Sequence, residues 1–221
     1  MEQTGTWARA GRRADRKTAK RLALPSWRSL AVFALVAAGA LAADLLSKHL
    51  VFRDFLSTPG LEQKIRQIVA DSSAAPLSQQ VLHQLDLHRP VGAGLRLTMS
   101  VNPGVVFGWN LPRSLVLLAT GGTILIVVAM LVSSPSRGGF QLSAIGLIFA
   151  GAMGNLYDRL FSSVQLPGLE PIRGYVRDFI DASQLHYPYV FNVADVWLVI
   201  GVGLLLIRSL IPCRQRPTPP A

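Results

Sequence analysis

The chain has 221 residues, of which 50% are hydrophobic and only 15% are charged. Soluble globular domains carry about 25% charged residues, so this composition argues against an ordinary water-soluble enzyme. The net charge of +10 would also suit a nucleic-acid-binding protein, and the positions of the charges decide between the two. A single cysteine, Cys213, excludes an intramolecular disulfide framework and a cysteine-based zinc site. The composition therefore predicts a small multi-pass membrane protein.

Four segments approach the roughly 20 apolar residues that a helix needs to cross a bilayer core about 30 Å thick. We expect the spans at residues 30–46, 115–132, 141–157 and 190–211. The predicted fold class is an all-α membrane protein with four transmembrane helices. The predicted organisation is a basic N-terminal extension at 1–28, a membrane domain at 29–211 with outer loops at 47–114 and 158–189, and a tail at 212–221.

The basic residues of the chain cluster around the spans. Those outside the predicted outer loops include Arg9, Arg12, Arg13, Arg16, Lys17, Lys20, Arg21, Arg28, Arg137, Arg214 and Arg216. Four spans place all of them on one side, which predicts that both termini are cytoplasmic. The basic run lacks interleaved aromatic residues for stacking on bases, so we expect no nucleic-acid partner. An alternative interpretation is a cleaved signal peptide ending near Ala40-Leu41-Ala42, although its basic region would be unusually long.

The first outer loop contains two kinds of pattern. Residues 61–73 and 77–88 have helical periodicity, with Ile65, Ile68 and Val69 on one face. This face predicts an amphipathic helix on the membrane surface. Residues 95–101 alternate apolar and polar side chains, which indicates a strand ending at the turn Asn102-Pro103-Gly104.

Charged and amide side chains gather near the outer ends of the predicted spans, where a charged group is a functional hypothesis by default. They are Asp44, Lys48, Asn155, Asp158, Arg159, Asn192 and Asp195, with Asn102 and Asp178 from the outer loops. Structural interpretations also apply to most of them. Asp44 and Lys48, four residues apart, would form an ion pair with Lys48 snorkelling to the interface. Asp158 would pair with Arg159, while the asparagines would serve in turns and caps.

Asp195 is harder to explain structurally, because it lies in an apolar run without a basic residue three or four positions away. The sequence has no Gly-x-Ser-x-Gly or His-Glu-x-x-His motif, and Cys213 is predicted on the inner side. Two aspartates about 3 Å apart would share a proton and activate a water molecule without metal or cofactor. From the residues alone, Asp158 ranks above Asp178 as the partner of Asp195.

Five blocks of the sequence, in order, resemble the lipoprotein signal peptidase (signal peptidase II) family of membrane aspartic peptidases. The blocks are Asp44-Leu45-Leu46-Ser47-Lys48, Asn102-Pro103-Gly104-Val105-Val106-Phe107-Gly108, Gly154-Asn155-Leu156-Tyr157-Asp158-Arg159, Gly174-Tyr175-Val176-Arg177-Asp178-Phe179-Ile180 and Phe191-Asn192-Val193-Ala194-Asp195. The sequence departs from the family pattern in an insertion at 57–94, in a longer stretch between Asp158 and Asp178, and at Val101, where a basic residue is common. Asp181 lies close enough to Asp178 to be confused with it.

The resemblance implies that Asp178 and Asp195 are the catalytic pair. It implies supporting or substrate-binding parts for Asn102, Gly104, Asn155, Asp158, Arg159 and Asn192, and a mainly structural part for Asp44 with Lys48. It also implies four helices with a small extracytoplasmic β-cradle. The implied activity is cleavage of diacylglyceryl-modified bacterial prolipoproteins before the lipidated cysteine, at the outer face of the inner membrane. We also expect contacts with membrane lipids and a monomeric protein.

Two alternatives come from other functional classes. A small proton-coupled transporter could use Asp195 as its proton carrier, but a permeation path needs polar groups through the midplane of the membrane. A non-catalytic assembly factor could use the basic N-terminus for contacts with anionic lipids. Release of a signal peptide from a lipidated precursor distinguishes a peptidase from both.

Overall fold

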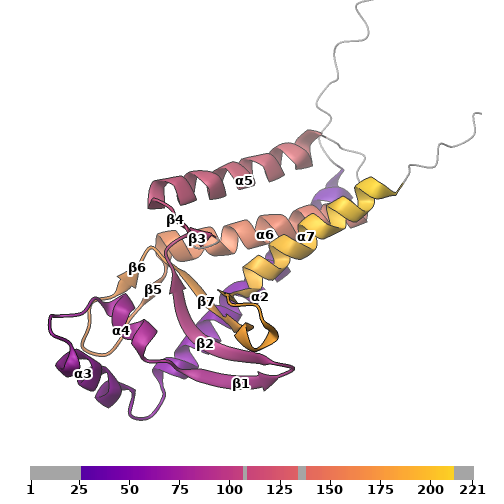
Figure 1. Ribbon diagram of the computed structural model, residues 1–221. Coiled ribbons are helices and arrows are strands. Elements are labelled where there is room, and N and C mark those ends of the chain that lie inside the picture. The colour runs from indigo at the N-terminus through magenta and orange to yellow at the C-terminus, as the bar shows by residue number, and fades with distance from the viewer. Residues whose placement is uncertain (1–25, 107–108, 134–137, 212–221) are drawn as a thin grey trace, which may run out of the picture.

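The computed structural model describes residues 26–106, 109–133 and 138–211. Four long helices lie next to a part containing a β-sheet and two short helices. The sheet and the short helices gather at one end of the long helices, here called the sheet end (Figure 1). Both ends of the described chain lie at the opposite end (Figure 1).

The four long helices are α2 (Trp27–Leu56), α5 (Arg113–Ser133), α6 (Gly139–Phe161) and α7 (Val193–Leu210). Each is long and apolar enough to cross a membrane. The prediction of four spans is therefore confirmed, and the protein is mostly helical, as expected for this fold class.

Two of the long helices continue past the predicted span ends at the sheet end. Helix α2 continues ten residues beyond the expected end at Leu46, to Leu56. The helix does not stop at the polar pair Ser47-Lys48 because Lys48 is fully buried against other elements. Helix α6 likewise reaches Phe161, so Asp158 and Arg159 lie in its last turn and not in a loop.

The last span begins later than expected. Val190–Phe191 form strand β8, which pairs with strand β7 (Val176–Asp181) at Ile180↔Phe191 and Asp181↔Val190. Helix α7 then starts at Val193, with Asn192 as its N-cap. Asp195 consequently lies in the first turn of α7.

Helix α6 is central and contacts α2, α5 and α7. Glycines let its neighbours approach closely, as expected for helices that pack inside a membrane. A Cβ on Gly151 would lie 2.5 Å from the carbonyl oxygen of Ala194, and one on Gly154 would collide with the carboxylate of Asp44. The small residues of α6 therefore place α2 and α7 directly beside its sheet end.

The main sheet is antiparallel, with strand order β1-β2-β7-β8. Strand β1 is His88–Gly92 and β2 is Leu95–Asn102, which confirms the strand predicted from alternation. In the register of β2 with β7, Ser100 lies opposite Asp178. Two small hairpins pair β3 (Val105–Val106) with β4 (Trp109–Asn110) and β5 (Ser163–Val164) with β6 (Ile172–Arg173). A 3₁₀ turn, η1 (Ser183–Leu185), precedes β8.

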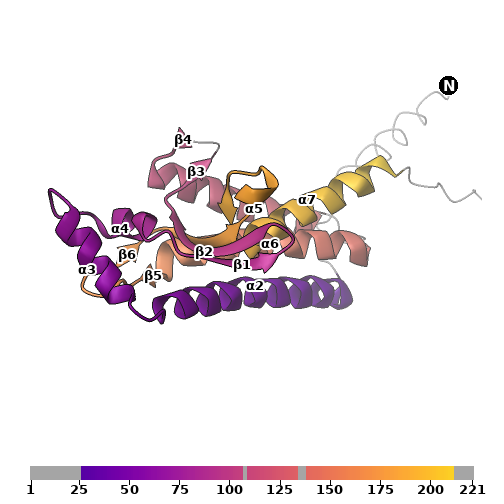
Figure 2. The ribbon, with the colours of Figure 1, turned by 60° about the horizontal axis from the view of Figure 1, so that its bottom comes forward.

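The insertion at 57–94 forms α3 (Leu61–Asp71), α4 (Ser78–Gln84) and β1. Its apolar residues share one core with the end of α2, which lies along the sheet (Figure 2). The first periodic segment forms helix α3, and Leu61 and Ile65 on its apolar face are buried in this core. The face expected on the membrane surface is thus used inside the protein.

Several sequence predictions fall outside the described residues. These are the basic extension before residue 26, Arg137, Phe107-Gly108 of the second family block, and the tail at 212–221.

Candidate active site

A cluster of buried charges lies at the sheet end of α2 and α6. The ammonium Nζ of Lys48 donates to Asp44 Oδ2 at 2.8 Å and to Asn155 Oδ1 at 3.1 Å, and it lies 3.2 Å from Asp158 Oδ2. The predicted pair of Asp44 with Lys48 is confirmed. Snorkelling of Lys48 is wrong, because its side chain is 0% exposed and its three partners hold it inside the protein.

Asp158 is also held from the sheet. Its Oδ1 accepts hydrogen bonds from Arg177 Nη2 at 2.6 Å and Nε at 3.1 Å, and its Oδ2 accepts from the Arg177 backbone N–H at 3.0 Å. The predicted ion pair of Asp158 with Arg159 is therefore replaced by pairs with Lys48 and Arg177. Asp158 thus joins α6 to β7 through Arg177, the residue before Asp178. Both of its carboxylate oxygens are already bound by Arg177 or Lys48.

Two asparagines connect this charged cluster to Asp178 and Asp195. Asn155 Nδ2 donates to Asp195 Oδ1 at 2.9 Å. Asn192 Nδ2 donates to Asp178 Oδ1 at 2.6 Å and to Asn155 Oδ1 at 3.1 Å. The Asn192 backbone N–H donates to Asp195 Oδ2 at 3.1 Å. A single residue, Asn192, thus contacts both carboxylates.

Asn192 occupies this position because of how α7 begins. As the N-cap, it accepts a hydrogen bond on Oδ1 from the Asp195 backbone N–H, while Asp195 caps back onto the Asn192 N–H. This reciprocal capping satisfies two backbone donors at the start of the helix. The cap predicted for Asn192 is confirmed, and it places the Asp195 carboxylate beside β7.

Asp178 and Asp195 line the same cavity, whose volume is about 450 Å³. The polar lining also includes Asn102, Asn155 and Arg159. Apolar and small residues of α5, α6, α7 and the loop before β8 complete the wall, among them Val116, Ala119, Ala152, Leu198, Tyr187 and Tyr189. Asp44, Lys48 and Asp158 are not part of this lining and lie buried behind it.

Arg159 contributes a positive charge to the described lining of the cavity. It is 9% exposed, and its Nη1 donates to the backbone carbonyl of Asn155 at 3.3 Å. Its Nε, among the described residues, has no hydrogen-bond partner. The unused N–H of a buried guanidinium can donate to a ligand oxygen at little further cost, because an unsatisfied buried donor is itself unfavourable.

The protonation of Asp178 is set by its surroundings. Burial and the nearby Asp195 carboxylate raise the pKa of Asp178 to about 7. Hydrogen bonds from Asn192 and Asn102 and the positive charge of Lys48 act in the opposite direction. Near neutral pH this carboxyl can therefore hold or release a proton, as acid–base catalysis requires.

Asp181 has a different environment from Asp178, although only three residues separate them. Its Oδ2 accepts from Arg96 Nε at 2.9 Å and Nη2 at 2.5 Å, and its Oδ1 accepts from the Ser183 N–H at 2.8 Å. Burial alone would raise its pKa, but the bonds from Ser183 and Arg96 lower the pKa below its usual range. Asp181 does not line the cavity.

Gly104 shapes the wall of the cavity next to Asn102. Its φ of +117° is a conformation that side chains disfavour, and a Cβ there would lie 2.6 Å from Val116 of α5. Its N–H donates to Asn102 Oδ1 at 2.8 Å. The turn predicted from the sequence thereby brings β2 close to α5.

Two features of the site were not predicted from the sequence: the contact of Arg177 with Asp158, and the aromatic wall formed by Tyr187 and Tyr189. The position of Tyr187 and Tyr189 just before the Phe191-Asn192 block could have indicated that these rings lie near the site. Among the described residues, no group of three His, Cys, Asp or Glu side chains is arranged to hold a metal ion.

A family model described as signal peptidase (SPase) II matches residues 36–211. The chain belongs to the signal peptidase II family. It is 39% identical over 131 residues to the lipoprotein signal peptidase of Caulobacter vibrioides, covering 55% of this chain and 68% of that one. It is 36% identical over 123 residues to the lipoprotein signal peptidase of Desulfitobacterium hafniense, covering 54% and 71%.

Two solved bacterial membrane enzymes share the fold of this family member. One superposes with a TM-score of 0.56 at 23% identity, covering 81% of this chain and 88% of the other. The second has a TM-score of 0.55 at 24% identity, covering 81% and 93%. The family match shows that the chain is a membrane hydrolase of the signal peptidase II type, and its four long apolar helices make it a multi-pass protein. The transporter and assembly-factor alternatives therefore lose their basis.

Proposed function

We propose that this signal peptidase II family member removes the signal peptides of diacylglyceryl-modified prolipoproteins, cleaving just before the lipid-bearing cysteine. The curated relatives are named lipoprotein signal peptidases, which gives the substrate class. The observation that carries the proposal is that Asp178 and Asp195 line one cavity and share Asn192 as a hydrogen-bond donor. The two carboxylates are the catalytic pair.

In the proposed reaction, Asp178 holds a proton and Asp195 is ionised. A water molecule between them gives a proton to Asp195 while its oxygen attacks the scissile carbonyl carbon. Asp178 donates its proton toward the carbonyl oxygen, and a tetrahedral intermediate forms. On collapse, the C–N bond breaks and the leaving amine takes a proton from the acid form of the pair. No metal and no cofactor enter these steps.

The remaining lining residues orient the substrate. Arg159 presents its unused donor to an oxygen of the bound peptide. The small and apolar side chains of α5 and α7, including Ala119 and Leu198, accept the hydrophobic signal segment from the bilayer. Asn102 and Asn155 keep the two aspartates in place at the boundary between the membrane and the sheet.

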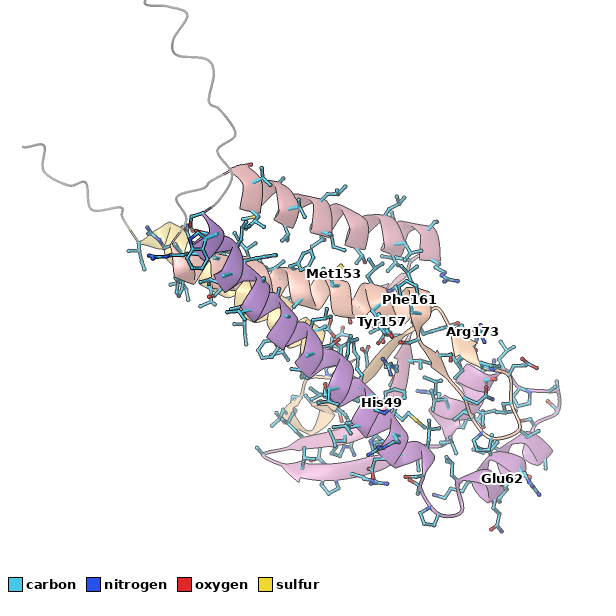
Figure 3. All side chains as sticks on the ribbon, turned by 180° about the vertical axis from the view of Figure 1, so that it is seen from behind. His49, Glu62, Met153, Tyr157, Phe161 and Arg173 are labelled. Atoms are coloured by element: carbon cyan, nitrogen blue, oxygen red, sulfur yellow. The ribbon has the colours of Figure 1, made fainter. Side chains whose placement is uncertain are left out.

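We place the catalytic cavity at the outer face of the bacterial inner membrane, with both termini cytoplasmic and the peptidase domain at 29–211. Exposed aromatic side chains mark the interface at the sheet end of α6. The rings of Tyr157 and Phe161 are paired at 5.5 Å there (Figure 3). Aromatic residues concentrate at membrane–water interfaces, which puts the neighbouring Asp158 and the cavity at that depth. We propose that the protein acts as a monomer.

The proposal is tested with purified protein in detergent or liposomes and a synthetic prolipoprotein segment carrying diacylglyceryl-cysteine. Mass spectrometry of the products should show cleavage on the N-terminal side of the modified cysteine. The same peptide without the lipid should be cleaved poorly. Absence of cleavage, or cleavage at another bond, contradicts the proposed function.

A further inference from the structure

The direction of the hydrogen bonds behind the cavity depends on the ammonium group of Lys48. The Lys48 ammonium has three donors and no acceptor. It meets Asp44 Oδ2 at 2.8 Å, Asp158 Oδ2 at 3.2 Å and Asn155 Oδ1 at 3.1 Å. Two of these partners are carboxylates, whereas Asn155 is an amide that has two possible orientations.

We infer that Lys48 is a positioning residue for the catalytic pair: its ammonium fixes the orientation of the Asn155 amide and so makes Asn155 a donor to Asp195. The inference rests on the proposed catalytic role of Asp178 and Asp195. It assigns Lys48 a function in the reaction beyond pairing with Asp44.

The reason is a matter of matching donors and acceptors. Asn155 Oδ1 accepts from both Lys48 and Asn192 Nδ2, so the amide NH₂ group must point the other way, to Asp195 Oδ1 at 2.9 Å. With the amide reversed, its NH₂ group would face two donors and its oxygen would face the Asp195 carboxylate. Each of these two mismatches in the reversed amide would leave buried polar groups unpaired, which costs about 1–3 kcal/mol for each group.

The other contacts of Lys48 keep it in this position. Asp44 also accepts the Ala194 N–H at 2.8 Å, and this bond ties the cation to the start of α7. Asp158 is held by Arg177, so that two carboxylates and two cations form one charge-balanced group. Lys48 is thus fixed from α2, α6, α7 and β7, and it transmits this rigidity to Asp195 through Asn155.

The test compares Lys48→Met with a matched control, Lys64→Met, on the exposed side of α3. Lys48→Met should lower kcat about 10- to 100-fold with a KM change below about threefold, since a misplaced base affects the chemical step more than binding. The alkaline limb of the kcat profile should move to higher pH. Lys64→Met should behave as wild type.

The shift in pH profile shows that Lys48 acts on the catalytic pair, because a merely structural role would reduce the amount of folded enzyme without moving the profile. The fall in kcat at nearly constant KM is the readout of positioning itself. The charged groups that face Asp178 are Lys48 from α2, Arg159 from α6 and Asp195 from α7. Lys48→Met removes only the Lys48 charge from the charged groups that face Asp178, and leaves Arg159 and Asp195 in place. A folded Lys48→Met enzyme with wild-type kcat and profile overturns the inference.

Lys48→Met leaves Asp44 without its buried counter-ion, and a second variant guards against misfolding. The double variant Asp44→Asn/Lys48→Met removes one charge of each sign and keeps the buried group balanced. It should fold but remain as slow as Lys48→Met, because Asn155 Oδ1 still lacks the charged donor and is held only by Asn192. Recovery of wild-type kcat in the double variant contradicts the inference. Failure of wild-type protein to cleave the precursor would instead contradict the proposed function.

Discussion

Asp178 accepts a 2.6 Å hydrogen bond from the side chain of Asn192, which connects the β-sheet to the first turn of α7. The same residue caps that helix and donates its backbone N–H to Asp195. Two carboxylates from separate parts of the sequence are thereby held by one residue, Asp178 by the side chain of Asn192 and Asp195 by its backbone N–H. The predictions below follow from this arrangement and from the buried groups around it.

The rate of cleavage should fall as the pH rises above about 7. The pKa of Asp178 is raised to about 7 by burial and by the Asp195 charge, so the proton of the general acid is lost above that value. The measurement is kcat against pH between 5 and 9 with a lipidated precursor. A kcat that keeps rising to pH 9 would show that a protonated Asp178 is not needed.

Asp178→Asn should stabilise the folded protein at neutral and higher pH. Because its pKa is raised, Asp178 binds more protons in the folded state than in the unfolded state. It therefore lowers the free energy of unfolding progressively as the pH rises from about 4 to 7. The neutral asparagine removes this penalty, which is at most on the order of 4 kcal/mol. Thermal unfolding in detergent should show a gain in Tm at pH 8 that disappears near pH 4. An unchanged or lower Tm at pH 8 would contradict this environment for Asp178.

Asp181→Asn should behave in the opposite way. Asp181 is 5% exposed and pairs with Arg96, and its lowered pKa means that the ionised form stabilises the fold above pH 4. Losing this pair should cost roughly 1–3 kcal/mol at pH 7 and reduce Tm. Cleavage by the folded protein should stay within threefold of wild type. A loss of activity comparable with that of Asp178→Asn would mean that the catalytic residue has been misassigned.

Gly154→Ala should prevent correct packing of the helices. The added Cβ would collide with the carboxylate of Asp44, which also binds Lys48 and the Ala194 N–H. Overpacking of this kind costs typically 1–3 kcal/mol, and here it also displaces a buried charge. Gly203→Ala on α7 is the matched control, because open space surrounds its Cβ position. Yield of monodisperse protein and Tm should fall for Gly154→Ala alone.

The four spans and strand β2 were predictable because each depends on a pattern within one segment: a long apolar run or a period of two. The boundaries at Lys48 and Val190 depend on distant partners. A lysine ends a predicted span unless Asp158 and Asn155, more than a hundred residues away, are known to surround it. Val190–Phe191 are apolar enough to extend a span, but β7 pairs with them first.

The site shows the same limit. Asp44 with Lys48 and the Asn192 cap follow from spacing along one helix, and both were predicted. Asp158 ranked above Asp178 from the residues alone because it lies nearer a helix end. Arg177 binds the Asp158 carboxylate from strand β7, and no local sequence pattern indicates that contact. Only the family blocks placed Asp178 in the pair.

The central claim, that Asp178 and Asp195 act as one catalytic unit, is tested most directly by comparing Asp178→Asn, Asp195→Asn and the double variant in the precursor cleavage assay. Each single variant should insert and fold yet lose at least about 10³-fold in kcat, and the double variant should be hardly worse, because residues that act as a unit are not additive. Activity within tenfold of wild type in either folded single variant, or a double loss equal to the product of two modest losses, would contradict the claim.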